Sequence, residues 1–242
     1  MAVRLKKAMV LAGGLGLRMR PLTLDKPKPL VPLAGKPLLD HVLDRLATAG
    51  IEIAVVNVHY LPEQIEKHVK GRRSPKVIIS DERDKLLDTG GGVLKALDKL
   101  GPDPFVICNS DSFSVPASAA SLARMAAAFD PKRMDCLMLL ATAANAIGYE
   151  GNGDFFMAPD GQLTRRRERQ VSPFAFTGTS IAHPRLFRDA PNGPFSLNIL
   201  WDRAIEENRL FGLRQDGQWM HVGSPAALAD AEQLLTTGEL YF

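Results

Sequence analysis

The chain has 242 residues, of which 45% are hydrophobic and 24% are charged, and its formal net charge is +3. This length and composition suit one large α/β domain, and we expect a single domain over residues 1–242. The basic residues are scattered and are not interleaved with aromatic residues, which argues against a nucleic-acid partner. No apolar run approaches a membrane span, and the N-terminal residues lack the apolar region of a secretory signal, so we expect a cytoplasmic protein with no membrane partner.

A glycine-rich loop follows the first predicted strand, the apolar run of residues 8–11. Its glycines are Gly13, Gly14 and Gly16. With no side chains in the way, backbone N–H groups of such a loop can approach an anion. Arg18 follows the loop, and Lys28 lies in a stiff Lys-Pro-Lys-Pro segment, so two cations are available to the oxygens of a nucleoside triphosphate. The spacing fits neither a Walker loop nor the G-x-G-x-x-G loop of dinucleotide-binding proteins.

Helices and strands alternate after this loop. Apolar residues recur at helical spacing over residues 38–49, residues 53–58 form a β-branched run, residues 62–69 form a helix that opens on a proline, and residues 77–79 form a third strand. This order predicts a parallel sheet with right-handed crossovers.

Two polar motifs end the first half. The sequence Asp-Thr-Gly-Gly-Gly opens a predicted helix over residues 88–100. Its bare backbone can lie against a flat group, although a flexible helix start gives the same pattern. A fourth strand, residues 105–108, leads into Asn109 and Asp111. Because ligands bind at the carboxyl ends of parallel strands, Asp111 is a candidate metal ligand, with a helix cap as the alternative.

The second half gives weaker signals. The expected elements are a helix at 118–129, a strand at 136–141, a hairpin within 151–161 that ends at a Pro-Asp-Gly turn, a helix capped by Ser196, and a helix at 225–235. Arginines dominate residues 165–169, and we interpret most of this run as a solvated edge, the alternative being one arginine that reaches a substrate phosphate. Cys108 and Cys136 lie in apolar strand-like runs, as buried reduced thiols do.

Residues 11–23 read LAGGLGLRMRPLT, and residues 26–39 read KPKPLVPLAGKPLL. These two motifs resemble the signature of the sugar-1-phosphate nucleotidyltransferase family, whose usual form is GGxGTR(L/M)xPLT followed by a PKP segment. The resemblance implies an α/β fold with a Rossmann-like, mostly parallel sheet flanked by helices and a smaller β-rich sugar-binding part. It also implies a nucleotide-binding half at residues 1–115 and a sugar-binding half at residues 116–242.

The resemblance assigns roles to individual residues. It implies that the catalytic residues are Arg18, Lys28 and Asp111. The implied nucleotide-binding residues are Leu11, Ala12, Gly13, Gly14, Gly16, Glu82, Thr89, Gly90, Gly91 and Asn109, where Glu82 is either a reader of the pyrimidine edge or a surface acid. The implied sugar-binding residues are Asp154, Thr177, Gly178 and Asn198, where Asn198 could equally be an exposed residue of a first helical turn.

The expected metal site departs from the family pattern. Residues 219–225 read WMHVGSP and resemble the family's W-x-D-(I/V)-G-(T/S)-P, whose Asp is normally the second metal ligand. His221 stands at that position here. Mg²⁺ prefers hard oxygen ligands, and imidazole suits it poorly. We therefore expect Asp111 to hold Mg²⁺, or Mn²⁺ instead, while His221 either replaces the missing ligand or leaves the site without it.

The expected reaction joins a nucleoside triphosphate and a sugar 1-phosphate into a nucleotide sugar and releases pyrophosphate. The compact length resembles the group that includes N-acetylmuramate-1-phosphate uridylyltransferases, so UTP and N-acetylmuramate 1-phosphate are the expected small-molecule substrates. Mannose-1-phosphate guanylyltransferase and glucose-1-phosphate thymidylyl- or uridylyltransferase activities are alternatives. A nucleotide-sugar-binding protein without catalysis is an alternative of another class, and the sequence gives no signal for the oligomeric state.

Overall fold

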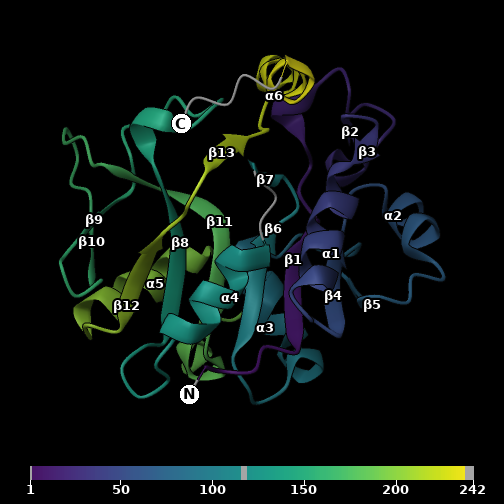
Figure 1. Cartoon of the computed structure of the whole chain (residues 1–242). Helices are drawn as coiled ribbons and strands as arrows, with labels where there is room; N and C mark the ends of the chain where they lie inside the picture. The colour runs from purple at the N-terminus through teal and green to yellow at the C-terminus, as the bar shows by residue number, and fades with distance from the viewer. Residues whose placement is uncertain (1, 116–118, 238–242) are drawn as a thin grey trace.

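A mixed nine-stranded sheet forms the centre of the computed structural model, which describes residues 2–115 and 119–237 (Figure 1). The N-terminal half supplies four adjacent parallel strands. In spatial order these are β6 (Phe105–Asn109), β1 (Lys7–Leu11), β4 (Ile53–Val58) and β5 (Lys76–Asp81). The predicted parallel sheet is thereby confirmed, and its crossovers are the expected helices.

The helices cover both faces of this sheet. They are α1 (Leu38–Thr48), α2 (Pro62–Val69), α3 (Asp88–Leu100), α4 (Ala119–Ala128) and α5 (Leu197–Glu206). Ala8 and Val10 of β1 share a core cluster with apolar residues of α1, α2 and α4, whereas Met9 shares a cluster with α3 and α5. Successive side chains of a strand point to opposite faces, so β1 is buried on both of them.

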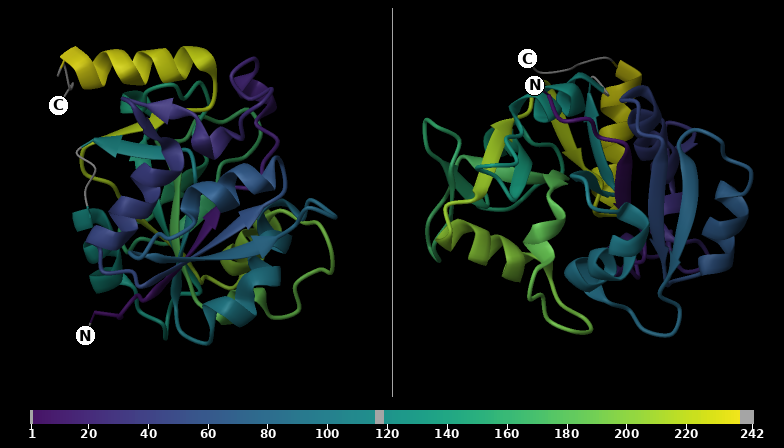
Figure 2. Two further views of the ribbon diagram at one scale, coloured as in Figure 1. Left: turned by 90° about the vertical axis from the view of Figure 1, so that its right-hand side faces the viewer. Right: turned by 90° about the horizontal axis from the view of Figure 1, so that it is seen from below.

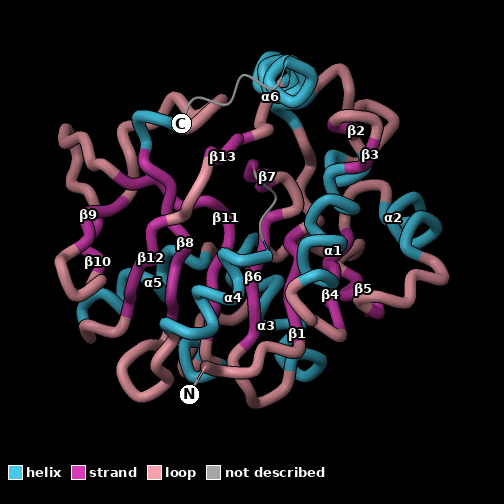
Figure 3. The backbone as a smooth tube through the Cα atoms, viewed as in Figure 1, coloured by secondary structure: helices cyan, strands magenta, loops and turns pink. Residues whose placement is uncertain are grey.

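The second half extends the sheet with mostly antiparallel strands. These are β8 (Cys136–Thr142), β9 (Phe155–Met157), β10 (Leu163–Arg165), β11 (Phe174–Ala182) and β12 (Leu210–Arg214). β11 pairs antiparallel with β6 and with β8, and β12 runs parallel to β8. Figure 3 shows these added strands to the left of β6. The smaller β-rich part therefore continues the same sheet.

Short elements pack above the carboxyl ends of β1 and β6. They are β2 (Pro32–Leu33), β3 (Lys36–Pro37), β7 (Ser112–Val115), β13 (Gln218–His221) and α6 (Pro225–Thr237), with 3-10 turns η1 (Leu17–Met19), η2 (Lys28–Leu30) and η3 (Ala143–Asn145). A fourth turn, η4 (Pro184–Phe187), follows β11 at the opposite end of the sheet, where Ala182 pairs with Phe105 at the start of β6. Met19, Leu33, Phe113, Met220 and Leu228 belong to one core cluster. This cluster joins the two N-terminal motifs to β7, β13 and α6, which lie together at one end of the molecule (Figure 2).

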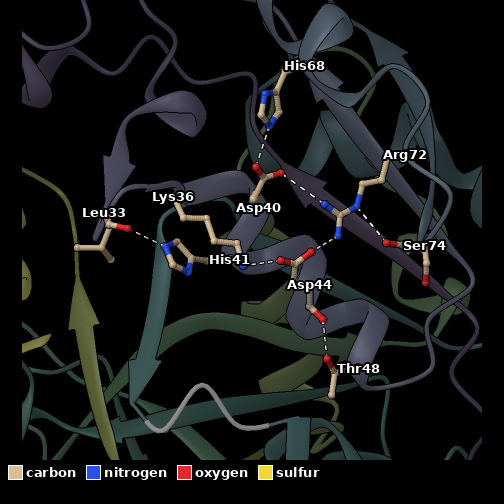
Figure 4. Close-up of polar contacts among 9 residues, drawn as sticks. All are labelled: Leu33, Lys36, Asp40, His41, Asp44, Thr48, His68, Arg72 and Ser74. Carbon is tan, nitrogen blue, oxygen red and sulfur yellow. Dashed lines mark hydrogen bonds and ion pairs between the residues drawn. The ribbon is translucent and has the colours of Figure 1, made fainter.

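A network of ion pairs fixes the outer surface of α1 (Figure 4). Arg72, which follows α2, bonds both Asp40, at 3.4 Å, and Asp44. Lys36 of β3 also pairs with Asp44, and His68 of α2 lies 3.0 Å from Asp40. Helix α1 is thus tied to α2 and to the β2–β3 hairpin, which fixes the proline-rich segment just before that hairpin.

The local patterns predicted most elements of the first half and fewer of the second. The strand at 53–58 and the helix at 62–69 have the predicted bounds, and the other strands and helices of the first half agree within two residues. The predicted hairpin is present as β9 and β10, but its Pro-Asp-Gly turn lies between the strands, so the prediction was wrong in ending the hairpin there. Strands β7, β12 and β13 were not predicted, and Ser118, the predicted start of α4, lies outside the described residues.

Cys108 and Cys136 are free and buried. Burial raises the pKa of the Cys136 thiol to about 12, so this group stays protonated at neutral pH. Both results confirm the interpretation as buried reduced thiols. Among the described residues, no helix has the length and apolar character needed to cross a membrane.

Candidate active site

The site forms where two neighbouring parallel strands end. Leu11 of β1 is opposite Asn109 of β6 in the sheet register, so the glycine loop and the segment leading to Asp111 leave the sheet side by side. A cavity of about 790 Å³ lies between them. Of the predicted catalytic and nucleotide-binding residues, those on its lining are Leu11, Ala12, Gly13, Gly14, Gly16, Arg18, Lys28, Thr89, Asn109 and Asp111.

The conformation and contacts of Gly16 determine the shape of the glycine loop. Gly16 has φ +64°, in the left-handed region, and a Cβ there would lie 3.2 Å from side-chain carbons of Lys28 and Thr23. Thr23 Oγ1 also donates to the Gly16 carbonyl at 2.8 Å. Gly16 therefore closes the turn tightly enough to place Arg18 and Lys28 on one cavity. A Cβ on Gly14 would meet nothing within 4 Å, so this glycine faces open space on the lining.

The charged residues of the cavity differ in whether they form an ion pair. The Lys28 ammonium forms an ion pair with Asp111 Oδ2, and the two side chains are only 13% and 19% exposed. Arg18 is exposed on the same lining and has no hydrogen bond or ion pair with any described residue. The cavity thus offers one neutralised pair and one free guanidinium that can meet an anion, and the exposed Asp88 carboxylate also lies on its lining.

A second, smaller cavity of about 110 Å³ shares Asn109 and Asp111 with the first. Thr177, Gly178 and His221, all from the second half, also line it. Gly178 has φ +82° at a register shift in β11, and a Cβ there would lie 2.9 Å from Asn109 Nδ2. Its glycine identity therefore permits the close approach of β11 to Asn109.

His221 reaches this place through strand pairing. It is the last residue of β13 and lies opposite Ser112 of β7, directly after Asp111. Burial lowers its pKa below the usual value, and the Lys28 and Arg18 cations add to this effect while Asp111 opposes it. At neutral pH the imidazole is accordingly uncharged and can offer a nitrogen lone pair or an N–H group.

Five predicted site residues lie off both cavity linings, and the structure places each in a protein contact instead: Glu82, Gly90, Gly91, Asp154 and Asn198. Glu82 is 1% exposed and accepts a 2.9 Å hydrogen bond from Asn57 Nδ2, so of its two alternative roles the surface acid was wrong. Asp154 accepts a 2.8 Å bond from the Phe176 amide.

The glycines that open α3 face protein rather than the cavity. A Cβ on Gly90 would lie 2.3 Å from the Phe195 ring, and one on Gly91 would lie 2.5 Å from the Gly193 carbonyl oxygen. The Gly90 amide donates to the Phe195 carbonyl at 2.8 Å. Thr89 Oγ1 accepts from the Leu197 amide at 3.0 Å. The bare backbone at this helix start therefore receives the segment before α5, while Asp88 and Thr89 remain on the cavity lining.

Two of the four arginines in residues 165–169 are engaged in the protein's own contacts, and Arg167 and Arg169 are exposed. Arg165 forms an ion pair with Asp202, donates to Asn198 Oδ1 at 3.3 Å and lies over the Phe155 ring. Arg166 donates to three backbone carbonyls, including that of Gly153 at 2.9 Å. Arg165 and Arg166 are therefore bound to protein groups, whereas the solvated edge that the sequence suggested applies to Arg167 and Arg169; the Arg165 contact also explains why Asn198 points to Arg165.

Several lining residues escaped the sequence analysis. Asn57, Leu86 and Pro194 line the larger cavity, and Tyr149 and Trp219 line the smaller one. Asn57 carried a usable signal, since it is a polar residue within an otherwise apolar β-branched strand. Leu86 and Pro194 carried none, because apolar loop residues are common.

Comparison with known proteins agrees with this geometry. The profile of the nucleotidyl transferase family matches residues 7–149, which include the glycine loop, Lys28 and Asp111. The chain is also 45% identical over 234 residues to the N-acetylmuramate alpha-1-phosphate uridylyltransferase of Caulobacter vibrioides, covering 95% of this chain and 97% of that protein. The chain belongs to the nucleotidyl transferase family.

Two further relatives place this nucleotidyltransferase in context. The N-acetylmuramate alpha-1-phosphate uridylyltransferase of Neisseria meningitidis is 33% identical over 231 residues, covering 94% of this chain and 97% of that protein. A UDP-glucose pyrophosphorylase solved with UDP-glucose superposes with a TM-score of 0.77 at 15% identity, covering 98% of this chain and all of the other. The latter shows that the fold is shared. The expected family, fold class and enzyme class are therefore confirmed.

Proposed function

We propose that this nucleotidyltransferase joins UTP and N-acetylmuramate 1-phosphate, forming the uridine diphosphate sugar and pyrophosphate. The 45% identity to the Caulobacter uridylyltransferase over nearly the full length of both chains carries this proposal. The two cavities support it, because they meet at Asn109 and Asp111 and so offer adjacent places for two substrates. We also propose that residues 1–115 supply most of the nucleotide site and residues 116–242 most of the sugar site.

The chemistry requires positioning and charge neutralisation. In such a transfer the sugar phosphate attacks the α-phosphorus in line as pyrophosphate leaves, so no protein nucleophile is needed. We infer that the glycine-loop amides hold phosphate oxygens and that Arg18, the free guanidinium, neutralises the leaving pyrophosphate. Lys28, already drawn to Asp111, is within the same lining to neutralise the α-phosphate.

Nucleotidyl transferases generally depend on a divalent metal ion. Among the described residues no group of three or more His, Cys, Asp or Glu side chains could hold such an ion. Asp111 fits Mg²⁺ nonetheless, since Mg²⁺ usually takes one or two carboxylates together with water and substrate oxygens. We propose that Asp111 would hold Mg²⁺ and that neutral His221 would act beside it or contact a phosphate. The ion would neutralise and orient phosphate oxygens.

The test is pyrophosphate release measured with each nucleoside triphosphate against a panel of sugar 1-phosphates. UTP with N-acetylmuramate 1-phosphate is expected to give the highest kcat/KM, because a site built for one base edge leaves polar groups unpaired with another base. A preference for GTP with mannose 1-phosphate, or for dTTP or UTP with glucose 1-phosphate, would overturn the substrate assignment. Nucleotide binding without turnover of any pair would overturn the assignment as an enzyme.

A further inference from the structure

We infer that Asn57 and Glu82 are a pair of positioning residues that sets the separation between the two walls of the nucleotide cavity. The inference rests on the proposed function only in that a nucleotide must occupy that cavity. One wall is the glycine loop after β1, which begins at Ala12. The other is the segment that contains Leu86 and leads into α3.

The pair forms a continuous chain of hydrogen bonds between these walls. Asn57 Oδ1 accepts from the Ala12 amide at 2.7 Å, and Asn57 Nδ2 donates to Glu82 Oε1 at 2.9 Å. Glu82 Oε2 accepts from the Leu87 amide at 3.3 Å. Because the Ala12 and Leu87 amides can only donate, the orientation of the Asn57 amide and the acceptor role of both Glu82 oxygens are fixed.

The Asn57–Glu82 pair is buried, which constrains the geometry of its hydrogen bonds. Asn57 is 4% exposed and Glu82 is 1% exposed, and Glu82 forms no ion pair with any described residue. Burial raises the pKa of the Glu82 carboxyl, although its hydrogen bonds and the more distant Lys95 and His59 act to lower that pKa. A buried carboxylate without a cation is costly, so its retention at this place calls for the bonds that it accepts.

Glycines of both motifs pack directly on the pair. A Cβ on Gly13 would lie 3.1 Å from Asn57 Nδ2. A Cβ on Gly92, the last glycine at the start of α3, would lie 2.8 Å from Glu82 Oε1 and 3.2 Å from Asn57 Nδ2. The glycine loop therefore approaches Asn57 and the start of α3 approaches both Asn57 and Glu82, so the pair acts as the spacer between the two glycine motifs.

Reciprocal substitution separates this role from generic packing. Glu82→Gln places an NH₂ donor against either Asn57 Nδ2 or the Leu87 amide, and Asn57→Asp places a second carboxylate against Glu82. The double variant N57D/E82Q restores all three hydrogen bonds and the original net charge, with Asp accepting from Ala12 and from Gln, and Gln accepting from Leu87. The pair in reverse is thus chemically equivalent to the native pair.

The experiment measures nucleotide Kd by calorimetry and KM for both substrates, with the triphosphate that the panel above prefers. Each single variant is expected to weaken nucleotide binding and raise nucleotide KM by about 10- to 100-fold, since misplacement by about 1 Å carries losses of this size. The KM for the sugar phosphate is expected to stay within about threefold. The double variant is expected to recover nucleotide affinity to within about threefold of wild type.

Ser114→Ala serves as the matched control, since Ser114 donates a buried 3.1 Å bond to Gln215 away from the nucleotide cavity. It is expected to lower Tm without changing nucleotide Kd. Single variants that lower Tm but leave nucleotide Kd unchanged would overturn the inference, as would a folded double variant that fails to recover. Failure of the wild type to turn over UTP with intact nucleotide binding would overturn the proposed function alone.

Discussion

The two glycine motifs face different partners, and alanine substitutions can show this directly. A Cβ on Gly90 would lie 2.3 and 2.5 Å from two carbons of the Phe195 ring and 2.9 Å from the Phe195 carbonyl oxygen. Phe195 is 5% exposed and shares a core cluster with Val93 and Leu197, so its ring has little room to move. A Cβ on Gly14 would meet no atom within 4 Å, and Gly14 has no positive φ.

These contacts give opposite expectations for the two variants. Overpacking at Gly90→Ala costs about 1–3 kcal/mol. Alanine returns up to about 1 kcal/mol through helix propensity. With the full return, the net loss is up to about 2 kcal/mol, which corresponds to a fall in Tm of up to about 8 °C in a chain of this size. Gly14→Ala should change the free energy of unfolding by less than about 0.5 kcal/mol but lower kcat/KM, because its methyl group enters the phosphate cradle.

For both variants, urea denaturation measures the free energy of unfolding and initial rates measure kcat/KM. Gly90→Ala combined with Phe195→Leu should regain part of the lost stability, since the smaller side chain makes room for the methyl group. A Gly90→Ala protein of wild-type stability and raised nucleotide KM would refute the reasoning. In that case Gly90 would serve the ligand rather than the packing of the segment before α5.

Three further predictions follow from the site and its surroundings. Arg18→Ala and Lys28→Ala should each lower kcat/KM by about 100-fold or more, because both cations face charge that builds up during transfer, and activity within about threefold of wild type would remove that residue from the mechanism. In a Mg²⁺ titration of initial rate, Asp111→Asn should nearly abolish turnover and His221→Asp should lower the half-maximal Mg²⁺ concentration; an unchanged midpoint together with an active Asp111→Asn would exclude a metal site here. Burial lowers the pKa of His183 below its usual 6.5, so just below that pH the unfolded chain binds more protons than the folded one and stability falls. His183→Gln should therefore flatten the decline of Tm between about pH 7.5 and pH 5.5, and an unchanged slope would contradict this account.

The structural features that could be predicted from the sequence are those that local patterns determine. The parallel strands and the helices of the first half follow from apolar periodicity, and a parallel sheet brings the loops after β1 and β6 together without further information. The placement of Arg18, Lys28 and Asp111 on one cavity was predictable for that reason.

The parts that sequence did not predict depend on contacts between distant segments. Strands β7 and β13 have four residues each, too few for a periodic signal, yet their pairing is what brings His221 to Asp111. The glycines at the start of α3 indicate that another segment approaches closely, but they do not identify it. That segment contains Phe195, which is distant in the sequence. Glu82 was ambiguous because a carboxylate after a strand is usually exposed, and only the fold shows that Asn57 and the Leu87 amide enclose it.

The replacement of a carboxylate by His221 changes the charge of the site as well as its ligands. Arg18 and Lys28 contribute two positive charges and Asp111 one negative charge, while the imidazole is neutral because burial lowers its pKa. With an aspartate at this position the same four side chains would balance to zero, whereas here they carry a net charge of +1. Asp88 adds one further negative charge to the lining of the larger cavity in either case, so His221 makes the site less negative by one charge, which favours anionic substrates. The site also has one hard oxygen ligand fewer. N-acetylmuramate 1-phosphate carries a carboxylate that mannose and glucose 1-phosphates lack, so the departure at His221 is in the direction that suits the proposed acidic sugar.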